Sequence, residues 1–393
     1  MPKKFVIITV GQFFSQFGDN LFTIAIAWYL AELTGNPLFI GIVTAIFNVI
    51  PLCNTFTGAF ADRHRKLPIM LAVTIVQIAL LACGAAFIGF FSLSLVAVLV
   101  VIQFACRIAG CFFDPAFTVL IPQLVDEESL QQANGIIQGV MLLGQIIGAA
   151  VGGILVAAVS PVAFLGINVL AYAVTLACLL AVFFKHEERI EAEEDEGHWY
   201  GGLTFIAKHH VLVHIIGIAV VVNFSLGPIM SMVALWVSDY LRLTSAMYGA
   251  VEAAFLVGAI AGSVLTGNIR ISFKAKMLGA LFVMGASVGA MAAFPYFAVT
   301  LAANGLVGFA GGIVNVALYT IIQTYVPNEV LGRVSGTLLA LTTVSQPLGM
   351  VAGGAVANVV GLPVMFLAGA TITVAVVLCS LPAHWDFAEL KRD

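Results

Sequence analysis

The sequence predicts an all-α membrane protein with twelve transmembrane helices, arranged as two six-helix pseudo-repeats. Composition is the first reason: of 393 residues, 61% are hydrophobic and only 9% are charged, whereas soluble proteins carry about 25% charged residues. The second reason is an internal repeat, because residues 109–159 recur without a gap as residues 310–360. The third is a series of apolar segments that are long enough to cross a bilayer.

The internal repeat consists of identical residues that keep one constant offset. Its period is far too long for a solenoid, whose units repeat every ~20–50 residues. It predicts two homologous halves, and parallel repeats of this kind are a known plan for membrane transporters. The matched pairs include Ala109 and Ala310, Gly110 and Gly311, Ala116 and Ala317, Glu128 and Glu329, Gly135 and Gly336, Gln145 and Gln346, Gly148 and Gly349, Gly152 and Gly353, and Gly153 and Gly354.

Apolar segments of about 18–25 residues follow one another along the whole chain, and each can span a bilayer as a helix. Helices are expected rather than a barrel, because long apolar runs satisfy their own backbone hydrogen bonds in lipid. The predicted spans are about 5–31, 38–61, 67–90, 94–119, 132–158, 161–184, 211–236, 246–268, 276–296, 298–323, 333–358 and 362–383.

One long polar segment separates the two sets of six spans. We therefore predict an N-terminal half at 1–184, a cytoplasmic linker at 185–210 and a C-terminal half at 211–393. An acidic run of this kind is typical of a solvated linker. Its acidic residues are Glu187, Glu188, Glu191, Glu193, Glu194, Asp195 and Glu196.

The basic residues predict the orientation of the spans, since cytoplasmic loops are enriched in lysine and arginine. An even number of spans puts both termini on one side. All 16 lysine and arginine residues except Arg107 and Arg242 fall on that side. The termini and the linker are therefore expected to be cytoplasmic, in the cell inner (cytoplasmic) membrane. No cleaved signal peptide is expected, because Lys3 and Lys4 precede a full-length span.

The loop after the second span reads Gly58-Ala59-Phe60-Ala61-Asp62-Arg63-His64-Arg65-Lys66. It resembles the signature G-x-x-x-D-R-x-G-R-[RK] of the major facilitator superfamily, although its second glycine is missing. The resemblance implies twelve helices in two halves that alternate access to a central site. It also implies a cytoplasmic gate, formed by Gly58, Asp62, Arg63, Arg65 and Lys66 together with an acidic residue low in the fourth span, Asp114.

Two further expectations concern this loop. Gly58 is expected to let two helices approach closely, as small residues do in membranes. A helix end near Ser335 or Thr337 is expected to receive the loop aspartate, because backbone N–H groups at a helix start favour an anion. The alternative, that Arg63, Arg65 and Lys66 only enforce topology, stays open.

The fifth span carries the glycines Gly144, Gly148, Gly152 and Gly153. Their spacing is similar to the antiporter motif G-x-x-x-G-P-x-x-G-G of the drug-exporting branch, with Ala149 in place of the proline. Glycines at this spacing make a flat helix face for packing against another helix. The missing proline is expected to leave the helix less kinked.

Three more stretches resemble the drug:proton antiporters of macrolide-efflux type within the superfamily. They are Ser15-Gln16-Phe17-Gly18-Asp19, the segment from Arg107 to Ala116, and the loop from Ile121-Pro122 to Asn134. The same subgroup includes siderophore exporters and a carrier of lysophospholipids. The resemblance therefore implies export of a hydrophobic or amphipathic compound, and it names no substrate.

Charged residues inside a membrane are costly, and they are functional candidates by default. Asp19 and Arg107 lie near the middle of the first and fourth spans, and Glu252 lies in the eighth. We expect Asp19 and Glu252 to face each other across the halves and to take up and release protons, since a low-dielectric site favours a protonated carboxyl group. Arg107 would hold Asp19 deprotonated in one state. The alternative is a permanent Arg107–Asp19 ion pair that only fixes packing, with Glu252 hydrogen-bonded locally.

Other polar, aromatic and thioether residues at cavity depth suit bulky amphiphiles, although no single one is singled out. They are Gln12, Gln16, Asn20, Asn48, Asn168, Asn223, Asn304, Asn315, Gln346, Phe13, Phe47, Phe224, Met230 and Phe255. The six cysteines are expected to act as small hydrophobic residues, and no metal site is expected, including at His209, His210 and His214.

No catalytic constellation and no phosphate-binding loop is evident, so we expect a secondary transporter that is not an enzyme. It would need no cofactor beyond a proton gradient and would function as a monomer, with small amphipathic substrates and membrane lipids as its partners. A lysophospholipid or siderophore carrier on the same fold is one alternative. A non-transporting membrane sensor and a channel are two others.

Overall fold

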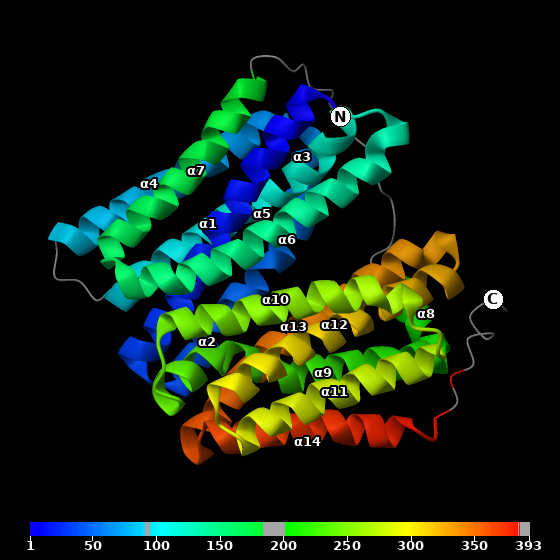
Figure 1. Ribbon diagram of the computed structural model, residues 1–393. Helices are drawn as coiled ribbons and strands as arrows, with labels where there is room; N and C mark the ends of the chain where they lie inside the picture. The colour runs from blue at the N-terminus through cyan, green and yellow to red at the C-terminus, as the bar shows by residue number, and fades with distance from the viewer. Residues whose placement is uncertain (91–94, 184–200, 384, 386–393) are drawn as a thin grey trace. The chain divides into compact units, whose positions relative to one another are not determined.

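The computed structural model describes residues 1–90, 95–183, 201–383 and 385. Every regular element within these ranges is a helix. The predicted acidic run, Glu187 to Glu196, lies outside the described residues, as do the side chains of Asp62 and Arg333 within their helices. The main helices (Figure 1) are α1 Lys3–Thr34, α2 Pro37–Val49, α3 Asn54–Arg63, α4 Lys66–Phe90, α5 Leu95–Leu120, α6 Glu127–Ala158, α7 Pro161–Phe183, α8 Gly201–Lys208, α9 His210–Leu235, α10 Ser245–Leu265, α11 Phe273–Ala293, α12 Phe297–Tyr325, α13 Asn328–Val360 and α14 Leu362–Ser380.

Ten of the described helices are long and apolar enough to cross a membrane. The two remaining predicted spans also form helices, with features that lower their hydropathy or length. The 32-residue α1 carries Gln12, Gln16, Asp19 and Asn20 along its apolar sequence. The second span divides into α2 and α3 around a 3₁₀ turn at Ile50–Cys53, because Pro51 has no backbone N–H to continue an α-helix. The all-helical membrane fold is confirmed.

The chain forms two compact units, and each contains a short segment from the other half of the sequence. Unit 1 comprises Met1–Leu33, Ile50–Glu194 and Thr244–Ala253, and unit 2 comprises Thr34–Val49, Asp195–Leu243 and Ala254–Asp393. The segment exchanged into unit 2 is α2, which packs along α13 and α9. The predicted division at 1–184 and 211–393 remains a prediction about the repeat.

Within unit 1, the glycines of α6 bring two backbones into contact. A Cβ atom added to Gly144 would lie 2.9 Å from the carbonyl oxygen of Phe13, and one added to Gly148 would lie 2.7 Å from that of Phe17. Gly153 faces the Thr244–Ala253 segment of the same unit, since a Cβ atom added to Gly153 would lie 2.9 Å from Gly249 Cα. Only glycine permits this distance between helices, which is the packing that small residues provide in membranes.

The repeated glycines of α13 do the same within unit 2. A Cβ atom on Gly349 would meet the backbone of Phe224 in α9, and one on Gly354 would lie 2.7 Å from the carbonyl oxygen of Pro37, at the start of α2. The two units therefore share one packing scheme. In each, a glycine-rich helix contacts the first helix of its own repeat and a segment from the other repeat.

We predict that Gly148→Ala destabilises the protein whereas Gly139→Ala does not. The added methyl group at Gly148 is forced against the backbone of α1, and overpacking costs about 1–3 kcal/mol. Gly139 lies on the same helix with no atom within 4 Å of its added Cβ, so alanine there is expected to be neutral or stabilising by up to about 1 kcal/mol. Denaturant unfolding of the purified variants in detergent measures both changes. Equal effects would contradict the packing assignment.

Candidate functional site

Asp19 is held in unit 1 by a tyrosine of another helix. Tyr172 of α7 is 1% exposed, and its hydroxyl donates a hydrogen bond to Asp19 Oδ1 at 2.5 Å. Such short hydrogen bonds to an ionisable carboxyl group are stronger than neutral ones. Tyr172 was missed by the sequence reasoning. Its only signal is a tyrosine in the middle of a largely apolar helix.

Arg107 on α5 completes a polar network around Asp19. Its Nη2 donates to Thr23 Oγ1 at 3.4 Å, and that hydroxyl donates to the carbonyl oxygen of Asp19 at 2.8 Å. Gln103, one turn before Arg107, also reaches Thr23 Oγ1 at 3.4 Å. Arg107 and Asp19 interact electrostatically. The structure therefore brings together the two residues that the sequence singled out, and the hydroxyl of Thr23 links the Arg107 side chain to the backbone of Asp19.

A buried amide lies next to this network. Asn168 of α7 is 0% exposed and lies one turn before Tyr172. Within the described part of the chain neither side-chain polar atom has a hydrogen-bond partner. Its Oδ1 is 3.0 Å from the position that a Cβ atom on Gly18 would occupy. Gly18 thus lets α7 approach α1 beside Asp19, and any larger residue there would displace the amide.

Glu252 belongs to the Thr244–Ala253 segment of unit 1. It accepts a hydrogen bond from Tyr248, on the preceding turn of α10. Tyr248 in turn stacks on Trp28 of α1, with ring centroids 6.3 Å apart, and Trp28 Nε1 donates to Glu32 at 2.7 Å. The two candidate carboxyl groups are therefore each held by a different tyrosine. Their proposed facing across the halves stays a prediction.

Unit 2 contains a cavity of about 400 Å³. It lies among α9, α10, α11, α12 and α13, and its wall is mostly apolar. Three methionines, Met230, Met277 and Met284, give it polarisable side chains that adapt to irregular shapes. Among the described residues that line it, none carries a charge. The polar lining residues are Asn223, Asn315, Tyr319, Thr342 and Gln346.

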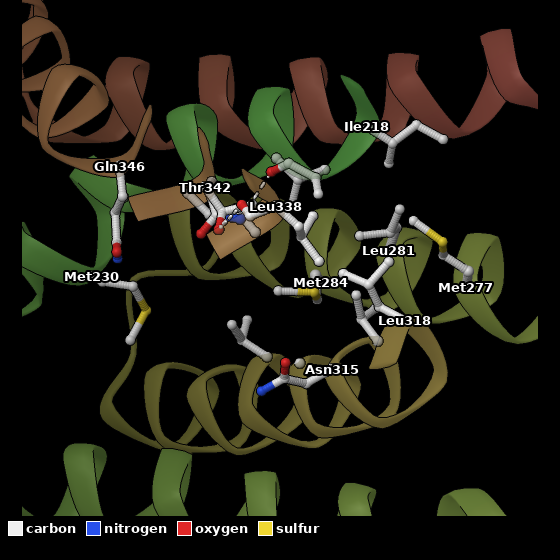
Figure 2. Close-up of a pocket in the computed structure, with 18 of the residues that line it drawn as sticks. Ile218, Met230, Met277, Leu281, Met284, Asn315, Leu318, Leu338, Thr342 and Gln346 are labelled. Carbon is white, nitrogen blue, oxygen red and sulfur yellow. Dashed lines mark hydrogen bonds between the residues drawn. The ribbon is translucent and has the colours of Figure 1, made fainter. Parts of the chain in front are cut away.

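Figure 2 shows how these side chains surround the space. Gln346 and Met230 extend toward each other at one end, and Met277 lies at the other. Two polar groups are engaged by their own helices, since Thr342 Oγ1 donates to the Leu338 carbonyl at 2.9 Å and Asn223 donates to that of Ala219 at 2.8 Å. The wall therefore offers mainly apolar surface, with a few amide groups to orient a ligand.

Several residues predicted at cavity depth line this space, namely Asn223, Met230, Phe255, Asn315 and Gln346. Others do not. Asn304 is 4% exposed and donates to the Thr300 carbonyl of its own helix, and Asn48 donates to the Thr44 carbonyl. Met277, Met284 and Thr342 were missed, because sequence periodicity cannot say which face of an all-apolar helix turns toward a cavity.

The predicted gate is described in part. Arg63 and Arg65 are exposed, Lys66 is 0% exposed, and the side chain of Asp62 lies outside the described residues. Among the described residues, a Cβ atom on Gly58 would meet no atom within 4 Å, so they show no close helix approach at this glycine. His64, which takes the place next to the missing glycine, stacks on Phe60 with ring centroids 4.1 Å apart.

The partners expected of the gate require one correction. Helix α13 begins at Asn328, so Ser335 and Thr337 lie two turns inside it and are not a helix end. The prediction was wrong because the loop before this span is shorter than its hydropathy indicates. Asp114 is exposed on α5, directly before Pro115. It also interacts electrostatically with Asp19.

Within the described residues no cluster of three or more His, Cys, Asp or Glu side chains could hold a metal ion. His209 is 4% exposed, and its Nδ1 lies 2.8 Å from the carbonyl oxygen of Phe205, while its ring lies 4.3 Å from that of Phe205. His214 lies against Trp385 with ring centroids 5.8 Å apart. Both imidazoles are thus placed by packing with aromatic neighbours.

The comparisons with known proteins agree with this architecture. Macrolide efflux protein A of Streptococcus pyogenes is 24% identical, over 95% of this chain and 94% of its own. The multidrug efflux pump Tap of Mycolicibacterium fortuitum is 25% identical, over 93% of this chain and 90% of its own. Among solved structures, a bacterial homologue of the iron transporter ferroportin in an inward-facing state superimposes with a TM-score of 0.73 at 16% identity, covering 100% of this chain and 99% of that one.

The fold and these similarities define a multi-pass membrane transporter of the major facilitator superfamily, which is not an enzyme. Within that superfamily the chain belongs to the family described as transmembrane secretion effector, whose model matches residues 2–389. The match covers both units, including the Asp19 network and the cavity of unit 2.

We predict that Tyr172→Phe lowers the free energy of unfolding by about 1.5–3 kcal/mol, the range for a hydrogen bond to a charged group. The ring still fills its place in α7, so only the hydroxyl contact with Asp19 is lost. Tyr296→Phe is the matched control, because Tyr296 is 68% exposed. Denaturant unfolding in detergent compares the two. Equal stability of the two variants would show that the tyrosine does not hold Asp19.

Proposed function

We propose that this chain is a proton-coupled secondary transporter that exports hydrophobic or amphipathic compounds, a multidrug efflux antiporter working by alternating access. The observation that carries the proposal is the cavity of unit 2, whose described lining is apolar and uncharged, with three methionines and a few amides. Such a wall recognises shape and apolar surface. It also tolerates different ligands, because methionine side chains repack around them.

The cavity favours neutral or amphipathic substrates over strongly charged ones. An ion that left water for this wall would find no opposite charge among its described residues, and that transfer is costly. The names of two relatives support the same class of substrate, since one is a macrolide efflux protein and the other is a multidrug efflux pump. The membership in a family of secretion effectors supports export over import.

Asp19 is the proposed proton carrier. It lies near the middle of α1 with one proton donor, Tyr172, and one cation, Arg107, acting on it. Competition between a proton and Arg107 for the carboxyl group would let a conformational change release the proton. Glu252, hydrogen-bonded to Tyr248, is the second candidate. We further propose cytoplasmic termini, a monomeric working unit and no cofactor other than the proton gradient.

Substrate-driven proton movement across proteoliposomes tests the coupling. With an imposed pH gradient, a lipophilic macrolide should drive proton release in the wild type, and Asp19→Asn should reduce it at least about tenfold. Asp239→Asn, at an exposed aspartate of the turn after α9, is the matched control and should keep full activity. Persistence of coupling in Asp19→Asn would transfer the role to Glu252. Absence of proton movement with every drug would favour the lipid or siderophore carrier.

A second variant tests the cavity itself. Gly311 lines the space, and no atom lies within 4 Å of a Cβ added to it. Gly311→Phe is therefore expected to fill the cavity without disturbing the helices, and to lower substrate binding at least about tenfold. Gly217→Phe is the control, since Gly217 is equally open and does not line the cavity. Fluorescence titration with a macrolide measures binding. Unchanged affinity in Gly311→Phe would remove the cavity from the transport path.

A further inference from the structure

A second hollow lies on α11 and α12, on the side of each helix turned away from the cavity. Its floor is made of small side chains, which leave room between the two helices. Larger apolar side chains border it, and two of them, Phe282 and Leu306, are 50% and 48% exposed. Both helices are candidate membrane spans, so an exposed apolar surface on them is suited to contact lipid. The small residues are Ala286, Ala290, Ala298, Ala302 and Ala303.

This hollow adjoins a second one toward the start of α11. The first has a volume of about 560 Å³ and the second about 270 Å³, and Val283 and Leu306 line both. We call these two adjoining hollows the groove, and their lining residues on α11 extend from Ala275 to Ala290, about 22 Å at ~1.5 Å per residue. One leaflet of the hydrocarbon core is about 15 Å thick. The groove is therefore long enough for one acyl chain.

One end of the groove is positively charged. Lys276 lines this end of the groove. Two more basic residues lie within six residues of Lys276: Arg270, which is exposed in the turn before α11, and Lys274, which is in the first turn of α11. Lys276 Nζ donates to the Thr266 carbonyl at 3.3 Å, and Lys274 Nζ donates to the Ala383 carbonyl at 2.8 Å. Carbonyl oxygens do not neutralise these charges. The sequence itself holds no acidic residue between Glu252 and Glu329.

We propose that this groove binds a phospholipid with an anionic head group. One acyl chain lies between α11 and α12 over the alanines, and the phosphate lies beside Lys276 and Arg270. An apolar groove within the hydrocarbon layer is filled by acyl chains, and basic residues at the membrane surface attract anionic lipids. Zwitterionic lipids carry the same chains without net charge. The charged end therefore selects the anionic kind.

The lipid site is separate from the proposed transport cavity. The cavity is lined by Met277, Leu281 and Met284 of α11, whereas the groove uses other positions of that helix. No residue lines both spaces. The two-helix wall of α11 and α12 thus has a ligand-facing side and a lipid-facing side, and the lipid is a bound component of the membrane protein rather than its substrate.

Native mass spectrometry of the purified full-length chain, incubated with phosphatidylglycerol or with phosphatidylcholine, tests the site. The wild type should retain more phosphatidylglycerol than phosphatidylcholine. This preference should fall as ionic strength rises, because salt screens exposed charges. In the double variant Arg270→Gln, Lys276→Gln, retention of phosphatidylglycerol should fall about fivefold per charge removed. Each basic residue near a membrane surface contributes ~1 kcal/mol to the binding of anionic lipid. Retention of phosphatidylcholine by the double variant should not change.

Ala302→Phe tests the apolar part of the groove. It places a ring over the alanine floor and should reduce retention of both lipids. Lys208→Gln removes a charge from the exposed end of α8, and Ala368→Phe adds a ring to an exposed alanine of α14. Both controls should retain lipid as the wild type does. Retention that is insensitive to salt, or that falls equally in the variants and their controls, would overturn the proposal, whatever the outcome of the transport assays.

Discussion

Close contact between glycine-bearing helices is the constraint on which the rest of unit 1 depends. Gly144 and Gly148 of α6 touch the backbone of α1 at Phe13 and Phe17. Gly18 presents another side of α1 to Asn168 of α7. Helix α1 is thus fixed between two neighbours, with Asp19 turned toward Tyr172. Without the glycines the helices would stand farther apart, and the hydroxyl of Tyr172 would not reach the carboxyl group.

The second copy of the glycine pattern has a different result. In unit 2, Gly349 and Gly353 bring α13 against α9, and the residues around this contact, Gly227 and Gln346, line the cavity. The helix of unit 2 that corresponds to α5 has Gly308 where α5 has Arg107. Unit 1 therefore holds a charged network, whereas the described residues that line the cavity of unit 2 carry no charge.

The two sides of the α11–α12 wall show why residue size is as informative as polarity in a membrane protein. Methionine and leucine face the cavity, and alanine lies at the floor of the lipid-facing groove. A hydropathy pattern treats all of these residues as apolar, so it cannot separate the two faces. The volume that each residue leaves empty distinguishes them. Only the packed structure shows that volume.

From the sequence, the all-helical membrane fold could be predicted and Asp19 and Arg107 could be named as candidate site residues, because burial of backbone and charge in lipid is costly enough to leave a signal in composition. The sequence-based prediction misplaced the start of α13, since hydropathy does not mark where a helix ends at the membrane–water interface. The three-dimensional contacts were needed to show that Tyr172 pairs with Asp19, that α2 packs in unit 2, and which faces line the cavity and the groove. These features depend on contacts between residues far apart in the chain, and local periodicity carries no record of them.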